Sequence, residues 1–351
     1  FIGSEASEKL PGFLQEKFPR RKKLYLITDS HVSALHADSL AGLLNQSGYD
    51  TLVHVVPSGE AAKSLACYEE CMTNGFRHHI GREGIILALG GGVIGDLAGF
   101  VAATYMRGIP FIQLPTTLLA HDSAVGGKVG INHSLGKNLI GAFYQPEAVV
   151  YDISYLQTLP VREWRSGFAE LFKHAFLSSE AFYHELHNEV KSIEDLKNHP
   201  KLGEWIEQGI KVKASIVAED ERESGKRAFL NLGHTLAHAM EGAAGYGELT
   251  HGEAVAFGLF SDLYLSRKYT GLDIDLDSLY QWLINLGYLT VTNDVLDIDR
   301  LIPYMKLDKK NQDGKIATIL LKNFGEPILS TFDEEEIRQD FAEFIGHYFA
   351  V

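Results

Sequence analysis

The feature that most constrains the fold is an apolar segment broken by glycines, IILALGGGVIGDLAGFVAATYM at residues 85–106. Its apolar character suggests a membrane span, but three consecutive glycines and Asp96 interrupt it. A spanning helix needs roughly 20 predominantly apolar residues without such breaks. The segment therefore predicts a buried strand, a glycine turn and a helix, which together form a building unit of α/β domains.

Strand and helix patterns alternate in the same way along the first 150 residues. Strand patterns cover residues 22–30, 51–59, 84–92, 110–117 and 148–152, and helical patterns lie between them through about Gly48, at 64–79 and at 95–107. Strands separated by helices indicate βαβ units and a mostly parallel sheet.

The pattern changes after Pro160, a residue that suits the first turn of a helix. From there apolar residues recur at helical spacing, and only residues 315–321 and 326–332 resemble a β-hairpin. We predict an α/β domain over residues 1–153, a mainly α-helical domain over 154–351, and a ligand cleft between them.

Composition narrows the class of partner. The formal net charge of −14 over 351 residues argues against a nucleic-acid or anionic-membrane binder, although a local group of lysines could still hold a small anion. Cys67 and Cys71 are the only cysteines, and no second Cys or His pair completes a zinc-finger pattern. Two reduced cysteines and the lack of a signal-peptide pattern lead us to expect a cytoplasmic protein.

A nucleotide site is indicated by Gly90–Gly95, which fits G-x-G-x-x-G between a predicted strand and a predicted helix. Such a turn lets a pyrophosphate approach the backbone at a helix N-terminus. The motif follows the third strand rather than the first, and LPTT stands where the usual acidic residue would lie. Asp29, at the end of the first strand, could hold a ribose hydroxyl instead. An ordinary tight turn is the alternative.

The helical half contains residues that could bind a metal. Glu170 is followed by Lys173 and His174, His234 and His238 lie four residues apart, and His251 follows. Two histidines and one carboxylate are typical of a catalytic zinc site that keeps a position open for substrate. The spacing does not choose among the four histidines, and structural histidines are the alternative.

Polar residues gather in two further segments. They are Asp122, Lys128, Lys137 and Asn138 among glycines, and Lys213, Glu223, Arg227 and Asn231 in the helical half. Solvated surfaces explain such charges in many proteins. Cationic groups near a nucleotide loop also suit a substrate with a phosphate or a carboxylate.

A family resemblance joins these features. The chain closely resembles the 3-dehydroquinate synthase family of sugar-phosphate cyclases through GGGVIGDLAGFVAATYMRGIPFIQLPTTLLAHDSAVGGKVGINHSLGKNLIGAFYQP, ESGKRAFLNLGHTLAHAME and LTHGEAVAFGL, in the family's order and spacing. The resemblance implies a Rossmann-like domain that binds NAD, a helical domain with one divalent metal, Zn or Co, and a homodimer. It also implies an anionic sugar-phosphate substrate and no nucleic-acid or membrane partner.

The resemblance assigns roles position by position. The metal ligands would be Glu170, His234 and His251. NAD would contact Asp29, Glu60, Lys63, Gly91, Gly92, Val93, Gly95, Asp96, Thr116, Thr117, Lys128, Lys137 and Thr158. Substrate binding would involve Asp122, Lys128, Asn138, Lys173, Lys213, Arg227, Asn231, His238 and either Lys309 or Lys310. Arg107 would reach the phosphate in the neighbouring subunit, and Glu223 and His238 would handle protons.

The implied reaction converts 3-deoxy-D-arabino-heptulosonate 7-phosphate into 3-dehydroquinate and phosphate, in the shikimate pathway to chorismate and the aromatic amino acids. It proceeds by transient NAD oxidation, β-elimination of phosphate, reduction and intramolecular aldol closure. Two alternatives stay open, namely a sister cyclase acting on another sugar phosphate and a metal-dependent polyol dehydrogenase. Lys213, Arg227 and Asn231 suit a substrate with a carboxylate and favour the 3-dehydroquinate synthase reaction over both alternatives.

Overall fold

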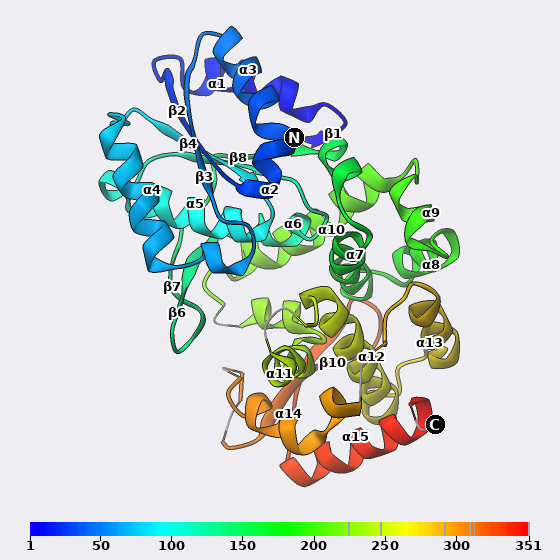
Figure 1. Cartoon of the computed structure of the whole chain (residues 1–351). Helices are drawn as coiled ribbons and strands as arrows, with labels where there is room; N and C mark the ends of the chain where they lie inside the picture. Colours follow the sequence, from blue (N-terminus) through cyan, green and yellow to red (C-terminus); the bar gives the residue numbers. More distant parts are fainter. Residues whose placement is uncertain (224, 246–247, 291–292, 309, 312, 350–351) are drawn as a thin grey trace. The chain divides into compact units, whose positions relative to one another are not determined.

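The computed structural model describes residues 1–223, 225–245, 248–290, 293–308, 310–311 and 313–349 (Figure 1). The chain divides into two units, Phe1–Pro160 and Val161–Val351, which are described separately. Lys309 and the remaining gaps lie outside the described residues.

The first unit is built around a parallel sheet. Its elements are β1 (Ile2–Gly3), η1 (Ala6–Lys9), α1 (Leu10–Lys17), β2 (Lys23–Asp29), α2 (Ser30–Val32), η2 (Ser33–Ala37), α3 (Asp38–Gln46), β3 (Asp50–Val56), η3 (Glu60–Ala62), α4 (Leu65–Arg77), β4 (Ile85–Gly90), α5 (Gly92–Thr104), η4 (Tyr105–Arg107), β5 (Phe111–Pro115), α6 (Ala120–Ser123), β6 (Lys128–His133), β7 (Gly136–Phe143), β8 (Ala148–Val149), β9 (Tyr151–Asp152) and η5 (Ile153–Thr158). Five strands pair in the order β3-β2-β4-β5-β8, all parallel. The predicted Rossmann-like α/β class is confirmed.

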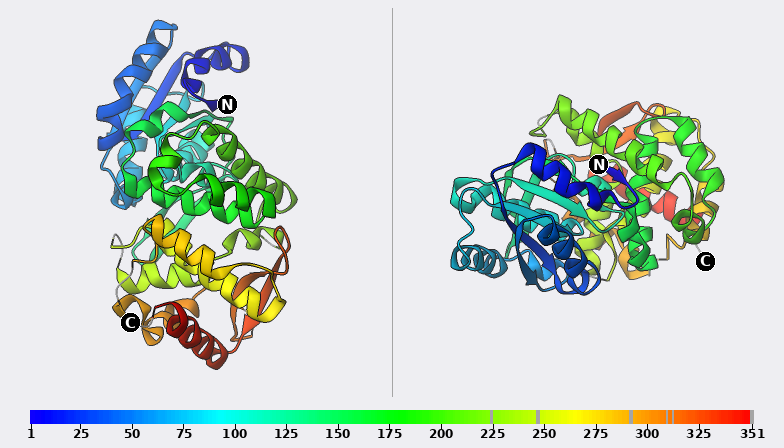
Figure 2. Two further views of the ribbon diagram at one scale, coloured as in Figure 1. Left: turned by 90° about the vertical axis from the view of Figure 1, so that its right-hand side faces the viewer. Right: turned by 90° about the horizontal axis from the view of Figure 1, so that it is seen from above.

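Alternating side chains give this sheet two buried faces. Leu24 and Leu26 of β2 pack into a core with α1 and α3, whereas Tyr25 and Ile27 pack into a second core with α4 and α5. This alternation follows from the two-residue period of a strand. Helices therefore cover both faces of the sheet (Figures 1 and 2), and β4 is buried at every residue, as expected for a central parallel strand.

The hairpin β6–β7 was not predicted from the sequence. Its strands are antiparallel, and β6 packs against α5. A Cβ on Gly130 would lie 2.5 Å from the Ile140 carbonyl oxygen, and one on Gly141 would lie 2.4 Å from the Val129 oxygen. The glycines therefore permit close approach of the two strands, although in the sequence they resemble loop residues.

Two other details differ from the expectations. Residues 148–152 form two short strands, because β8 pairs with β5 while β9 pairs with β1. Helix α5 begins at Gly92 rather than Gly95, so part of the glycine motif lies in its first turn. Within the described part of the chain, no helix combines the length and apolarity that crossing a membrane requires.

The second unit is mainly helical, as predicted. Its elements are α7 (Val161–Phe176), α8 (Glu180–Glu189), α9 (Ile193–Lys197), α10 (Leu202–Glu219), η6 (Lys226–Asn231), α11 (His234–Ala244), α12 (His251–Thr270), α13 (Leu276–Asn285), η7 (Asn293–Leu296), α14 (Ile298–Met305), β10 (Ile316–Leu321), β11 (Pro327–Phe332) and α15 (Glu334–Tyr348). The predicted hairpin is confirmed as the antiparallel pair β10–β11.

Helix α12 is the central element of this unit. It packs against α7, α11, α13, α15 and β10, and most of its residues are buried. Figure 2 shows it as the long yellow helix in the left view, with α15 in red. A capping box between Thr250 and Glu253 begins the helix, and Gly271, in the left-handed region with φ 76°, ends it.

Candidate functional site

Three helices of the second unit meet because two glycines allow their backbones to touch. A Cβ on Gly252 would lie 2.0 Å from the carbonyl oxygen of Ser166 in α7. A Cβ on Gly258 would lie 1.9 Å from the carbonyl oxygen of Gly233, which precedes α11. These contacts fix α7 and α11 against α12 and bring the predicted metal ligands on the three helices close to one another.

Glu170, His234 and His251 form one cluster. Glu170 Oε1 lies 3.1 Å from His251 Nε2 and 3.3 Å from His234 Nε2. Donors at the corners of a tetrahedron with bonds of roughly 2.1 Å lie about 3.4 Å apart, so this spacing fits a divalent metal such as zinc. The three residues each offer one donor atom within 4.8 Å of the others.

The imidazole rings are oriented by bonds to their other nitrogens. His234 Nδ1 lies 3.1 Å from the Leu232 carbonyl oxygen, so this nitrogen carries the proton and donates. His251 Nδ1 lies 3.3 Å from Glu241 Oε2. Both Nε2 atoms are therefore turned toward Glu170, which is the arrangement a metal requires.

Charge in the cluster is balanced by close ion pairs. Burial alone would raise the pKa of Glu170, but Lys173, whose Nζ lies 2.5 Å from Oε2, and the two histidines hold that pKa well below its usual value. Burial would likewise lower the pKa of His251, but bonds to Glu170 and Glu241 raise it to about 10. A cation bound at His251 Nε2 would replace the proton there as the partner of Glu170, while Glu241 would keep the proton on Nδ1.

The other two histidines considered from the sequence have different positions. His238, one turn along α11, is solvent-exposed, and its ring centroid lies 5.4 Å from that of His234. It therefore borders the cluster from the solvent side, where a substrate could reach it. His174 is fully buried in α7.

A second group of predicted residues surrounds η6. The Arg227 side chain is buried and donates to the Glu221 carbonyl oxygen at 2.5 Å. Asn231 Nδ2 donates to Glu223 Oε1 at 3.4 Å, and Glu223 adopts φ 59°, in the left-handed region. Lys213 is buried on α10. The structure thus brings Asn231 and Glu223 together.

Lys310 lies on the segment after α14. Its Nζ is 2.5 Å from Asp308 Oδ2, and its side chain is about 10% exposed. Lys309, the alternative substrate ligand, lies outside the described residues.

In the first unit, the sheet order explains the unusual position of the glycine motif. The strands lie side by side in the order β3-β2-β4-β5-β8. Renumbered one to five along the chain, this order is 2-1-3-4-5, so successive strands are added in opposite directions on the two sides of the β2–β4 boundary. Ligands of such sheets bind at the carboxyl ends of the strands beside this reversal. Asp29 ends β2, and the glycine loop follows β4, so both lie at this point even though the motif follows the third strand.

The glycine loop has no room for side chains. A Cβ on Gly91 would lie 2.8 Å from Thr117 Cγ2, and one on Gly92 would lie 2.9 Å from Ser123 Oγ. The loop leads into the N-terminus of the 13-residue helix α5, whose first N–H groups suit a phosphate. Val93, Gly95 and Asp96 lie in the first turns of that helix, and Thr116 directly follows β5.

Asp29 also has a structural role. Its Oδ1 accepts hydrogen bonds from the backbone N–H groups of His31 and Val32, at 2.8 and 3.0 Å. The carboxylate therefore caps the helical segment that follows β2, which fixes its direction.

Lys63 connects several predicted residues of this unit. Its buried Nζ lies 2.7 Å from Asp96 Oδ2, and it donates to the Asn138 amide oxygen. Glu60 Oε1 accepts from Asn132 Nδ2 at 2.8 Å and lies 3.9 Å from the lysine. An open pocket of about 410 Å³ is lined here by Glu60, Ala61, Lys63, Ser64, Leu65, Asn132, His133 and Ser134.

The remaining predicted residues are dispersed over this unit. Thr158 ends η5 and contacts His36 Nε2 at 3.0 Å. Arg107 ends the η4 turn with φ 74°, in the left-handed region, and is exposed. Asp122 lies in α6, Lys128 begins β6 and Lys137 lies in β7.

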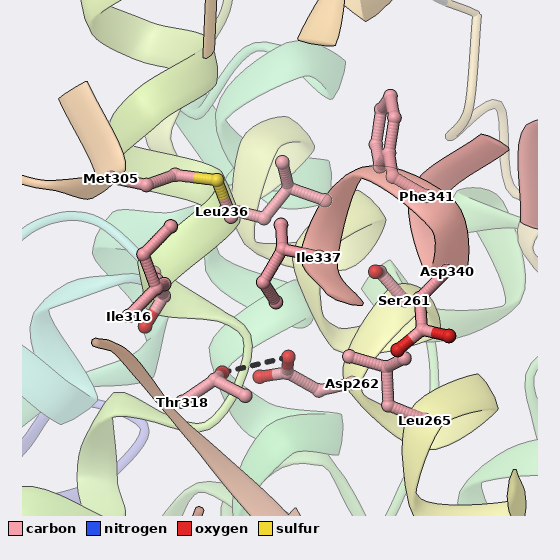
Figure 3. Close-up of a pocket in the computed structure, with 11 residues that line it drawn as sticks. Leu236, Ser261, Asp262, Leu265, Met305, Ile316, Thr318, Ile337, Asp340 and Phe341 are labelled. Atoms are coloured by element: carbon pink, nitrogen blue, oxygen red, sulfur yellow. Dashed lines mark hydrogen bonds between the residues drawn. The ribbon is translucent and has the colours of Figure 1, made fainter. Parts of the chain in front are cut away.

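Four residues that shape the metal cluster were not predicted, namely Glu241, Gly252, Gly258 and Asp262. Asp262 is buried in α12; its Oδ2 accepts from the Gly233 N–H at 2.7 Å and its Oδ1 accepts from Thr318 Oγ1 at 2.8 Å (Figure 3). Glu241 follows His234 by seven residues, a two-turn helical spacing that could have indicated a shared face. The spacing along the chain does not reveal the roles of Gly252, Gly258 and Asp262.

Together these features define a class of protein, an enzyme with a nucleotide-type glycine loop in an α/β domain and a cluster of candidate metal ligands in a helical domain. Family models described as 3-dehydroquinate synthase N-terminal and C-terminal match residues 53–166 and 167–311. The 3-dehydroquinate synthase of Bacillus pumilus is 51% identical over 343 residues, covering 97% of this chain and 93% of that protein. The chain belongs to the 3-dehydroquinate synthase family.

Two further proteins are similar to this chain over almost its whole length. The 3-dehydroquinate synthase of Geobacillus kaustophilus is 49% identical over 337 residues, covering 96% of this chain and 92% of that protein. A solved structure of 2-deoxy-scyllo-inosose synthase, complexed with carbaglucose-6-phosphate, NAD+ and Co2+, has a TM-score of 0.87 and 27% identity. The similarity covers 97% of this chain and 95% of that chain.

Proposed function

We propose that this chain converts 3-deoxy-D-arabino-heptulosonate 7-phosphate into 3-dehydroquinate and phosphate. Membership of the 3-dehydroquinate synthase family supports the reaction. The observation that carries it is the cluster of Glu170, His234 and His251, whose spacing suits one divalent cation with a position left for substrate oxygens.

The proposed cofactors are NAD and one divalent metal, Zn or Co. When bound, NAD would remove and return a hydride, and the metal would act as a Lewis acid on substrate oxygens. The solved relative that holds NAD+, Co2+ and a sugar-phosphate analogue supports both. We propose residues 1–153 as the NAD-binding domain and 154–351 as the domain for metal and substrate.

The substrate's two anionic groups require cations held in place. In this proposal Lys173, Lys213 and Arg227 bind substrate, and burial of all three side chains would strengthen that attraction. Further substrate contacts are proposed for Asp122, Lys128, Asn138, Asn231 and Lys310.

Proton transfer is proposed for two residues near η6 and α11. His238 is exposed beside the metal cluster, and Glu223 is also exposed, so a bound substrate can reach either side chain. A side chain held beside the reacting carbon atoms would transfer protons faster than an acid or base that must diffuse in from solution.

NAD contacts are proposed for the glycine loop and the residues around it. They are Asp29, Glu60, Lys63, Gly91, Gly92, Val93, Gly95, Asp96, Thr116, Thr117, Lys128, Lys137 and Thr158. The carboxyl-end position of Asp29 and the glycine loop supports this part of the proposal.

We also propose a cytoplasmic homodimer in which Arg107 reaches the phosphate of the neighbouring subunit's substrate. The exposure of Arg107 in a left-handed turn is compatible with this role. Mixing an Arg107→Ala chain with a Lys173→Ala chain tests it. Shared sites would restore part of the activity, whereas sites confined to one subunit would leave the mixture inactive.

The decisive test of the reaction measures phosphate released from the heptulosonate phosphate with NAD and Zn2+. Release that stops on treatment with a chelator and returns with added metal supports the proposal. Glucose 6-phosphate, which lacks a carboxylate, is assayed in parallel as an alternative substrate. Turnover of glucose 6-phosphate in place of the heptulosonate would identify a sister cyclase instead.

A further inference from the structure

Glu241 occupies the same face of α11 as His234. The two residues are seven positions apart, which is close to two helical turns, so their side chains project in similar directions. The Glu241 side chain is 13% exposed, and its Oε2 lies 3.3 Å from His251 Nδ1. A carboxylate of α11 therefore contacts a proposed metal ligand of α12.

The two proposed histidine ligands are held by different kinds of partner. His234 Nδ1 faces the Leu232 carbonyl oxygen, a backbone group two residues away. His251 Nδ1 faces the Glu241 side chain. The His251 side chain is also 30% exposed, compared with 11% for His234, so surrounding atoms restrain its ring less.

An imidazole can bind a metal through either nitrogen, and its other nitrogen decides which one is available. A carboxylate at Nδ1 accepts the proton there and leaves the Nε2 lone pair directed at Glu170. It also makes that lone pair more basic, which strengthens a metal bond. Removing Glu241 would let the His251 ring rotate or change tautomer while leaving all three proposed ligands in the chain.

Helix α12 provides a matching contact for α11. Asp262 Oδ2 accepts the N–H of Gly233, at 2.7 Å, and Gly233 adopts φ 82° immediately before His234. Figure 3 shows Asp262 also accepting from Thr318. Asp262 of α12 thus fixes the start of α11, and Glu241 of α11 contacts the ligand at the start of α12. The geometry of the site depends on both contacts.

We propose that Glu241 is a positioning residue for the metal centre: it selects the tautomer and the ring orientation of His251 in which Nε2 faces Glu170. The inference rests on the proposed ligand set. It predicts that Glu241 controls metal affinity and ligand geometry without binding the metal itself.

The test uses the whole chain stripped of metal, with Glu241→Ala, Glu241→Gln and the matched control Glu207→Ala. Glu207 is an exposed acid on α10 that pairs with Lys211, so its removal changes the net charge equally. Zn2+ affinity is measured by competition with a chelator, the Co2+ absorption spectrum reports ligand geometry, and urea unfolding of the metal-free protein reports stability. His251→Ala serves as the reference for loss of a ligand.

We expect Glu241→Ala to weaken Zn2+ binding by about 10- to 100-fold and to change the Co2+ spectrum. Glu241→Gln retains an acceptor oxygen without the charge, so its loss should be smaller, and Glu207→Ala should match the original chain. A purely structural residue would instead lower the unfolding midpoint and leave the Co2+ spectrum of the folded protein unchanged.

Normal Zn2+ affinity and a normal Co2+ spectrum in Glu241→Ala, with metal lost in His251→Ala, would overturn the inference and leave the ligand set standing. If His251→Ala also kept its metal, the proposed ligand set itself would be wrong, and the inference would fail with it. If Glu241→Ala did not fold, Glu241→Gln would decide: the inference requires a measurable loss of Zn2+ affinity in that variant, and an unchanged affinity and spectrum would overturn it.

Discussion

His251 links the two halves of the proposed metal centre, because its Nε2 faces Glu170 while its Nδ1 faces Glu241. We predict that His251→Ala removes the metal and lowers turnover by at least about 1,000-fold, since substrate oxygens would lose their Lewis acid. NAD binding should largely survive, because the glycine loop belongs to the other unit. Metal analysis and an NAD titration of the purified variant check this. Stoichiometric metal would contradict the ligand assignment.

Asp262 accepts a hydrogen bond from Gly233, the residue before His234, and its pH behaviour gives a second test. Burial raises its pKa to about 7, although bonds from Gly233 and Thr318 act in the opposite direction. The folded protein therefore keeps this proton at pH values where the unfolded chain has lost it. This difference in proton binding adds to the free energy of unfolding at low pH. The added stability is lost as pH rises from about 4 to about 7, by about 1.4 kcal/mol for each pKa unit of difference.

We predict that Asp262→Asn flattens this part of the pH dependence, because asparagine does not titrate. Urea unfolding of both proteins at intervals from pH 4.5 to 7.5 gives the two slopes. The difference in unfolding free energy between the two proteins should change steadily across the range. A constant difference would show that Asp262 titrates normally in the folded state.

At the scale of elements, the site depends on the close approach of α11 and α12. Gly258→Ala would place a Cβ 1.9 Å from the Gly233 oxygen, so the helices would have to separate. We predict a loss of roughly 1–3 kcal/mol or more in unfolding free energy, together with weaker Zn2+ binding. Gly346→Ala is the control, because its Cβ meets nothing within 4 Å in α15. That change should be neutral or stabilising. Equal stability of the two variants would contradict the account.

Elements with a clear period were predictable from the sequence, and elements made by glycine contacts were not. The apolar run of β4 and the two strands of β10–β11 carry strong local signals. The hairpin β6–β7 does not, because Gly130 and Gly141 weaken strand propensity in isolation and are explained only by the backbone opposite each of them. Likewise, nothing local shows that Gly252 must accommodate Ser166.

At the scale of the whole molecule, the candidate metal site could be predicted only in part. The four-residue spacing of His234 and His238 suggests a shared metal, yet the donors that cluster are Glu170, His234 and His251, from three helices. The positions of Gly252 and Gly258 bring these helices together, and that packing is long-range in sequence. Family resemblance implied the proposed ligand set, whereas the contacts of Glu241 and Asp262 are visible only in the structure.

The nucleotide site shows the same limit in the first unit. The glycine motif could be recognised locally, but its place after the third strand is explained only by the 2-1-3-4-5 order of the sheet. That order puts the ends of β2 and β4 next to each other, which makes Asp29 a neighbour of the loop. Strand order is set by tertiary pairing, which a local pattern does not contain.

In the proposed reaction, this chain couples NAD and a metal to phosphate elimination without net oxidation. The most direct measurement follows phosphate release and absorbance at 340 nm together, with the heptulosonate phosphate and catalytic amounts of NAD. We expect many phosphates released per NAD, an equal amount of 3-dehydroquinate and no accumulation of NADH. NADH accumulating in proportion to substrate consumed, without phosphate, would contradict it and would identify a dehydrogenase.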